Sequence, residues 1–125
     1  MTLDKDRNMA LKPSYNDKLH LPGLSNTEIL ILALEASQKL EWNIREVTPE
    51  GVRFEVPFSI RSHGEAITFT IEKGSDGEVS VRSQSSSVQF VDYGKNRKNI
   101  QKLRETMEEI KASLTPEELA QRAKD

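Results

Sequence analysis

The side chains that could do chemistry in this sequence gather in one stretch, VDYGKNRKNIQKL, where its last long helix is expected to begin. The cations of this stretch are Lys95, Arg97, Lys98 and Lys102. The N-terminal end of a helix carries roughly half a positive charge, so carboxylates are preferred there and cations are slightly unfavourable. The placement of these cations therefore needs an explanation.

One explanation is a bound anion. Backbone amides that follow Gly94, the helix dipole and the cations would converge on one spot, which suits a phosphate or a carboxylate. The predicted anion-binding site consists of Gly94, Lys95, Asn96, Arg97, Lys98 and Lys102. The alternative hypothesis is a solvated basic face, neutralised by Asp92 at the helix start and by acidic residues of the neighbouring sheet.

Asn96 differs from the cations around it because it falls on the apolar stripe of the helix, four residues before Ile100. A polar side chain on a buried face needs hydrogen-bond partners. We expect Asn96 to tie the helix start to the preceding turn, through Asp92 or through the serines at 85–87. The alternative is an amide that lines a ligand pocket.

Residues for catalysis are sparse. The sequence has no cysteine, which excludes disulfides, thiolate catalysis and cysteine-based zinc sites. The two histidines, His20 and His63, have no metal-ligand spacing. We therefore predict a non-enzymatic protein without a metal site or cofactor. A hydrolytic enzyme is the weakest hypothesis and would require a pocket that joins His63, the serines at 83–87 and Asn96.

The bulk composition limits the partners that the protein can have. The chain has 125 residues, 18 Lys and Arg, 20 Asp and Glu, and a formal net charge of -2. This balance does not favour nucleic acid, so we expect a protein partner or an anionic headgroup. The start of the sequence lacks the apolar core of a signal peptide. The longest apolar run, ILILAL, is far shorter than the roughly 20 residues of a membrane span, which predicts a cytoplasmic protein.

The pattern of apolar residues predicts three segments. Residues 1–22 are polar and aperiodic, which predicts a flexible N-terminal arm whose Leu19 and Leu21 could dock on the body of the protein. Residues 23–114 form the predicted α+β domain, and residues 115–125 form a short C-terminal helix or a frayed tail.

Local signals define the elements of that domain. Ser25 and Glu28 form a capping box that predicts a helix over residues 26–39. Alternation of apolar and polar residues then predicts strands in the segments EWNIREV, VRFEVPF, AITFTIE and VSVRSQS. Spacings of three and four predict a last helix whose buried stripe is Ile100, Leu103, Met107, Ile110 and Leu114.

These elements predict an α+β two-layer sandwich: helix, four- or five-stranded antiparallel sheet, helix, with both helices on one sheet face. Pro57 suggests that Val52–Phe58 is an edge strand or contains a bulge, because proline cannot donate to a ladder. The leading functional hypothesis is a non-enzymatic binding or accessory module. The alternative is a structural interaction domain that forms a homodimer through this edge strand, so both monomer and homodimer stay open.

The sequence contains three further motifs: Trp42 near the first strand, Arg82-Ser83-Gln84-Ser85 at a strand end, and the Asp-x-Gly-x-Asn run of Asp92, Gly94 and Asn96. Together they resemble a small α+β domain family that is widespread in bacteria and has no established activity. The resemblance covers roughly residues 40–112 and supports the α+β fold. The family pattern has an arginine and then a glycine where this sequence has Ser86, Ser87 and Val88.

Overall fold

The computed structural model describes residues 13–57, 64–85 and 94–124. Its elements, in chain order, are β1 (Ser14–His20), α2 (Asn26–Lys39), β2 (Asn43–Thr48), β3 (Gly51–Val56), β4 (Glu65–Ile71), β5 (Glu78–Ser85), α3 (Lys95–Ala112) and α4 (Pro116–Lys124). The strands form one five-stranded antiparallel sheet in the order β1-β5-β4-β3-β2. The predicted α+β class and antiparallel sheet are therefore confirmed.

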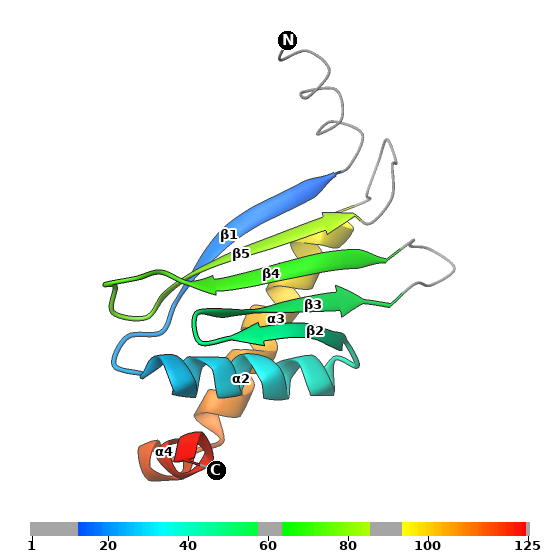
Figure 1. Cartoon of the computed structure of the whole chain (residues 1–125). Coiled ribbons are helices and arrows are strands. Elements are labelled where there is room, and N and C mark those ends of the chain that lie inside the picture. Colours follow the sequence, from blue (N-terminus) through cyan, green and yellow to red (C-terminus); the bar gives the residue numbers. More distant parts are fainter. Residues whose placement is uncertain (1–12, 58–63, 86–93, 125) are drawn as a thin grey trace.

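The two long helices pack on the sheet face that carries the apolar side chains. Side chains alternate along the strands, so that β4 reads buried and exposed in strict turn. Val52, Phe69 and Val81 lie opposite one another on β3, β4 and β5 and are buried with the stripes of α2 and α3. Figure 1 shows α3 crossing behind the sheet while α2 runs along its β2 side.

Local capping signals set the helix boundaries. The predicted helix over 26–39 is confirmed, and the Ser25–Glu28 capping box is present with hydrogen bonds of 2.8 and 3.1 Å. A second capping box joins Thr115 and Glu118 at the start of α4. Of the two predictions for the C-terminal segment, a short helix or a frayed tail, the structure shows the helix. Leu119 of α4 is buried in the core. Within the described ranges, no helix is both long enough and apolar enough to cross a membrane.

The predicted arm over residues 1–22 is wrong for its last part, because Ser14–His20 form the edge strand β1. The inward positions of β1 are Tyr15, Asp17 and Leu19, and only Leu19 is a fully buried hydrophobic residue. The central inward residue, Asp17, pairs with Arg104 of α3 at 2.7 Å. This ion pair places a polar residue on the inner face, which hid the alternation expected of a strand.

The predicted edge position of Val52–Phe58 is also wrong. β3 pairs with β2 on one side and with β4 on the other, so the edges of the sheet are β1 and β2. Pro57 follows the last residue of β3, Val56, and therefore lies outside the ladder, where its missing N–H leaves no pairing unmade. Phe58 lies outside the described residues.

We predict that Leu19→Ala lowers the free energy of unfolding by about 2–5 kcal/mol, because it deletes buried methyl groups and leaves a cavity. Leu19 is 5% exposed and belongs to the core. Urea denaturation measures the effect, with the exposed neighbour Lys18→Ala as the matched control. A loss below about 1 kcal/mol would show that β1 is dispensable and that the arm hypothesis holds.

The contact between β1 and α3 predicts a pH dependence. The hydrogen bond from Arg104, followed by the one from the Lys18 backbone, lowers the pKa of Asp17. Since the pKa is lower in the folded state, the carboxylate stabilises the fold above its unfolded pKa of about 3.9, and this contribution is lost as the pH falls through the folded pKa. Asp17→Asn should therefore be less stable than the parent at pH 7, and the difference should shrink towards pH 2. Denaturation across this range tests it, with the exposed Glu105→Gln as control; a difference independent of pH would contradict it.

Candidate functional site

The predicted site at the start of α3 keeps its cations in solvent. Arg97, Lys98 and Lys102 are exposed and Lys95 is half-buried. Gly94 is the N-cap residue, in a left-handed conformation with φ 75°, and no side chain of the described residues caps the helix there. The first turn contains no acidic residue. The described structure thus leaves Lys95, Lys98 and Lys102 without an ion pair, while the charge of Arg97 contributes to the lowered pKa of Asp17.

Asn96 does not belong with those cations, because its side chain is fully buried and engaged by the sheet. Ser83 Oγ donates to Asn96 Oδ1 at 2.7 Å. Asn96 Nδ2 donates to Ser85 Oγ at 3.1 Å and to the backbone oxygen of Pro13 at 3.0 Å. Both ends of the amide are therefore used inside the protein, as expected for a structural residue rather than one that meets a ligand.

This network connects two of the motifs that carry the family resemblance. Ser83 and Ser85 come from the Arg-Ser-x-Ser strand end, and Asn96 comes from the Asp-x-Gly-x-Asn run. Ser85 is one of the partners that the sequence predicts for Asn96, whereas Asp92 and residues 86–87 lie outside the described residues. The hydrogen bonds of Ser83 and Ser85 with Asn96 fasten the start of α3 to β5.

Sequence reasoning missed two further members of the buried network. Asn99 Nδ2 donates to Glu65 Oε1 at 2.9 Å and to Ser83 Oγ at 3.3 Å. Glu65 is 2% exposed although it carries a carboxyl group. The available signal is the spacing of Asn96 and Asn99, which places both amides on the same side of α3 one turn apart.

Catalytic and metal-binding constellations do not form among the described residues. His20 is exposed, with Nε2 at 3.2 Å from the backbone oxygen of Asp76 and 3.8 Å from a Glu78 oxygen. His63 lies outside the described residues. Across residues 13–57, 64–85 and 94–124, no cluster of three or more His, Asp or Glu side chains could hold a metal ion.

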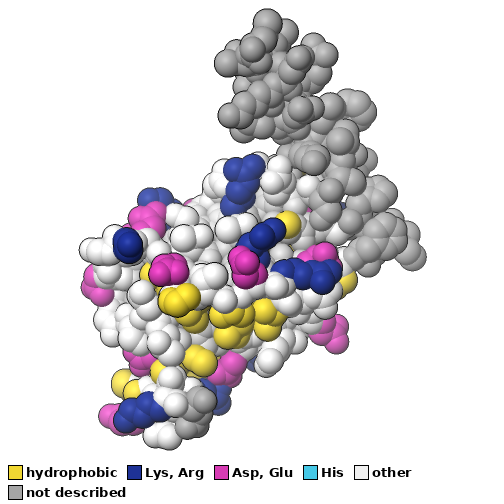
Figure 2. Space-filling model, viewed as in Figure 1, with side chains coloured by type: hydrophobic (Ala, Val, Ile, Leu, Met, Phe, Trp, Pro, Cys, Tyr) yellow, Lys and Arg dark blue, Asp and Glu magenta, His cyan; other side chains and the backbone are white. Residues whose placement is uncertain are grey.

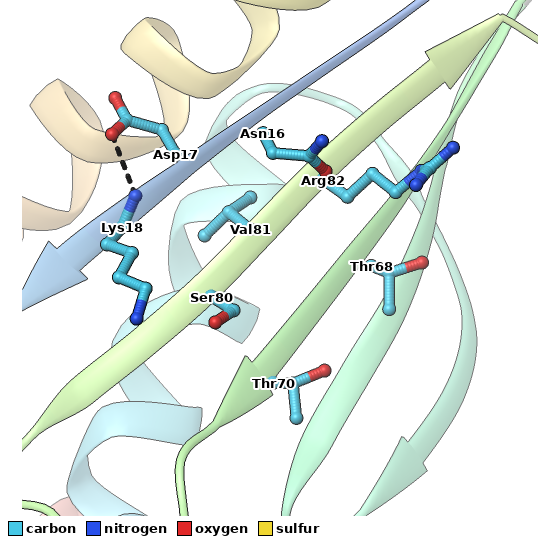
Figure 3. Close-up of a pocket in the computed structure, with 8 residues that line it drawn as sticks. All are labelled: Asn16, Asp17, Lys18, Thr68, Thr70, Ser80, Val81 and Arg82. Atoms are coloured by element: carbon cyan, nitrogen blue, oxygen red, sulfur yellow. Dashed lines mark hydrogen bonds between the residues drawn. The ribbon is translucent and has the colours of Figure 1, made fainter.

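A hollow lies on the sheet face that the helices do not cover, and we call this face the outer face. Its volume is about 540 Å³, and it spans β1, β5 and β4. The hollow is lined by Asn16, Asp17, Lys18, Thr68, Thr70, Ser80, Val81 and Arg82 (Figure 3). A second hollow of about 150 Å³ adjoins it, shares Thr68 and Thr70, and extends to Arg53 on β3.

Strand register arranges the outer face in rows. Thr68 lies opposite Arg53 on one side and Arg82 on the other, so the two arginines flank one hydroxyl. Adjacent strands are about 4.8 Å apart, which places the two arginine Cα atoms roughly 10 Å apart, within joint reach of their side chains. In the next row Thr70 lies opposite Ser80, which adds two hydroxyl groups beside them.

The charges of the outer face are unequally neutralised. Lys18 pairs with Glu72 at 3.1 Å, which raises the pKa of Lys18. The pKa of Glu72 is lowered, first by the hydrogen bond from Ser80 and then by Lys18. Arg82 is half-buried, and its guanidinium makes no hydrogen bond or ion pair within the part of the chain that the structure describes. Arg82 is therefore the cation of this hollow that is available to a ligand.

Comparison of the chain with protein-family models and with curated proteins finds no match. The resemblance to the bacterial domain family thus stays a prediction from the motifs. The case for function rests on the two candidate sites, the start of α3 and the outer-face hollow.

We predict that Asn96→Ala lowers the free energy of unfolding by about 2–3 kcal/mol, because it removes the acceptor of the buried Ser83 hydroxyl and the amide that donates to Ser85. Thermal or urea denaturation measures the effect. Lys98→Ala on the same helix turn is the control and should cost less than about 0.5 kcal/mol. If Asn96→Ala left stability unchanged but altered ligand binding, the pocket hypothesis for Asn96 would be the correct one.

Proposed function

We propose that the chain is a non-enzymatic cytoplasmic binding module that takes a small anionic ligand, a phosphate ester or a carboxylate, in the outer-face hollow. The observation that carries the proposal is Arg82, a half-buried guanidinium with no acidic partner among the described residues. Arginine presents several N–H donors in a planar fork that matches phosphate and carboxylate oxygens. Thr68 and Thr70 add hydroxyl donors around it, whereas the hydroxyl of Ser80 already donates to Glu72.

Binding rather than catalysis fits the lining. Asp17 is the only lining residue with a carboxylate, and its carboxylate is engaged by Arg104 and by the Lys18 backbone. A general base must be free to accept a proton from the substrate, and a carboxylate with a lowered pKa is poorly suited to that task. The hydroxyls are consequently more useful as ligand donors than as nucleophiles.

The start of α3 is the weaker of the two sites for this function. Arg97, Lys98 and Lys102 are exposed on a helix surface, and Asn96 is used inside the protein. The outer-face hollow offers a concave surface with a cation and hydroxyls together, which is the usual form of a ligand site. A protein partner or an anionic headgroup could each present the anion.

The proposal predicts a site-specific response to inorganic phosphate and to a phosphomonoester. In an amide-resolved NMR titration, the amides of Thr68, Ser80 and Arg82 should shift saturably. Arg82→Gln should weaken binding at least tenfold, since a charge-assisted hydrogen bond contributes about 1.5–3 kcal/mol. The matched control is Arg97→Gln, which removes the same guanidinium at the start of α3 and should leave the affinity within about twofold.

The outcomes separate the two sites. A loss of binding in Arg97→Gln, with Arg82→Gln unaffected, would move the site to the start of α3. If no amide responds to either compound at concentrations up to roughly 10 mM, the anion-binding proposal is wrong. A separate titration with vesicles of anionic lipids distinguishes a headgroup from a free phosphate. Binding to a vesicle broadens the signals of all amides at once, whereas a small phosphate shifts only those near the site.

A further inference from the structure

β2 is an exposed edge strand with an apolar surface. All six of its residues are exposed, and β3 is its only partner among the described strands. Ile44 and Val47 are the exposed large hydrophobic residues of the described structure, at 41% and 51%. An edge strand with unpaired backbone groups and exposed apolar side chains is a template for pairing with another strand.

Both apolar side chains of β2 point to the helix side of the sheet. Ile44 lies opposite Phe54 and Val47 lies opposite Val52, and these two residues of β3 are buried in the core. Residues that lie directly opposite on paired strands share a face. The register shifts between Ile44 and Glu46, so one additional residue, Arg45, lies between the two apolar positions.

Helix α2 continues this apolar surface. Leu30 and Leu34 are half-buried and one turn apart, on the helix flank away from Glu35, which pairs with Arg122 of α4. We define the edge patch as Leu30, Leu34, Ile44 and Val47. Figure 2 shows a band of hydrophobic side chains over the region where β2 and α2 lie in Figure 1.

The sequence of β2, NIREVT, is complementary to itself in the antiparallel direction. With a two-fold axis between Arg45 and Glu46, Arg45 of one subunit lies opposite Glu46 of the partner subunit. The same axis places Ile44 opposite Val47 of the partner subunit. Opposite charges and apolar side chains each stabilise a cross-strand pair, whereas like charges would oppose it.

The faces of these pairs agree with the rest of the structure. Arg45 pairs with Glu55, and Glu46 lies opposite the exposed Arg53, so both charged residues lie on the outer face. Ile44 and Val47 lie on the helix side of the sheet, where α2 contacts β2. The ionic pairs would thus form in solvent and the apolar pairs would form between the two helix layers.

We infer that the chain forms a homodimer through antiparallel pairing of β2 with β2 of a second copy, with the edge patch as its apolar contact. The interface is isologous, as expected of a two-fold dimer. This interface joins two five-stranded sheets into one. The outer-face hollow over β1, β5 and β4 stays open in each of the two subunits. The inference therefore does not depend on the proposed anion site.

Sedimentation equilibrium of the full chain tests the dimer across concentrations from roughly 1 μM to 1 mM. The expected result is a concentration-dependent mass that approaches twice the chain mass. Val47→Lys should weaken the dimer at least tenfold, because it places a charge in the apolar contact. Glu105→Arg, an exposed charge reversal on α3, is the control and should leave dimerisation unchanged. Val47 is exposed, so a thermal melt should show that the variant still folds.

Charge reversal tests the register. Arg45→Glu alone and Glu46→Arg alone should each weaken the homodimer, since like charges then face each other twice across the axis. An equimolar mixture of the two variants should restore dimerisation as a heterodimer, in which opposite charges face each other again. Arg45→Glu also removes the ion pair of Arg45 with Glu55. If that variant fails to fold, Glu46→Arg and Val47→Lys still test the interface.

Three results would overturn the inference. The first is a monomer at every concentration, which would leave β2 for another protein or for solvent. The second is a dimer that Val47→Lys does not weaken, which would place the interface elsewhere. The third is a mixture of Arg45→Glu and Glu46→Arg that dimerises no better than either variant alone.

Discussion

The amide of Asn96 is the interaction on which the arrangement of the helix layer depends. It accepts from Ser83 and donates to Ser85, so that the first turn of α3 is fixed on β5 at one register. The apolar stripe that begins at Ile100 then meets the sheet in one position. Apolar packing alone would tolerate a shift along the helix, whereas a buried amide with both ends bonded does not, because each misplaced bond would leave a buried polar group unsatisfied.

β5 consequently serves two surfaces with alternate residues. Its inward serines hold α3, while the outward residues Ser80 and Arg82 line the open face of the sheet. The period of two separates these roles, since neighbouring side chains point to opposite faces. A substitution at an outward residue of β5 therefore leaves the contacts of its inward serines with α3 in place.

Sequence patterns predict the parts of this fold that local chemistry determines. The helix over 26–39 follows from the Ser25 cap and the apolar stripe, and the alternating strands follow from their period of two. Two features depend on which strands pair: Ser14–His20 form a strand, and β2 lies at the edge of the sheet. Strand pairing is a non-local property that no short window of the sequence contains. The outer-face hollow was missed for the same reason, because Arg82 and Thr68 become neighbours only through the register of β4 and β5.

The pairing of the first and last strands has a consequence for how the chain folds. Ser14 lies opposite Gln84, about 70 residues later, so β1 cannot join the sheet until almost all of the sheet has been made. At a synthesis rate of about 5–20 residues per second, β1 waits roughly 4–14 s for its partner on the ribosome. The hairpins from β2 to β4 have low contact order and can form during this interval. The β1 edge is thus the last part of the sheet to close, and its polar, lysine-bearing sequence suits a segment that must stay in water until then.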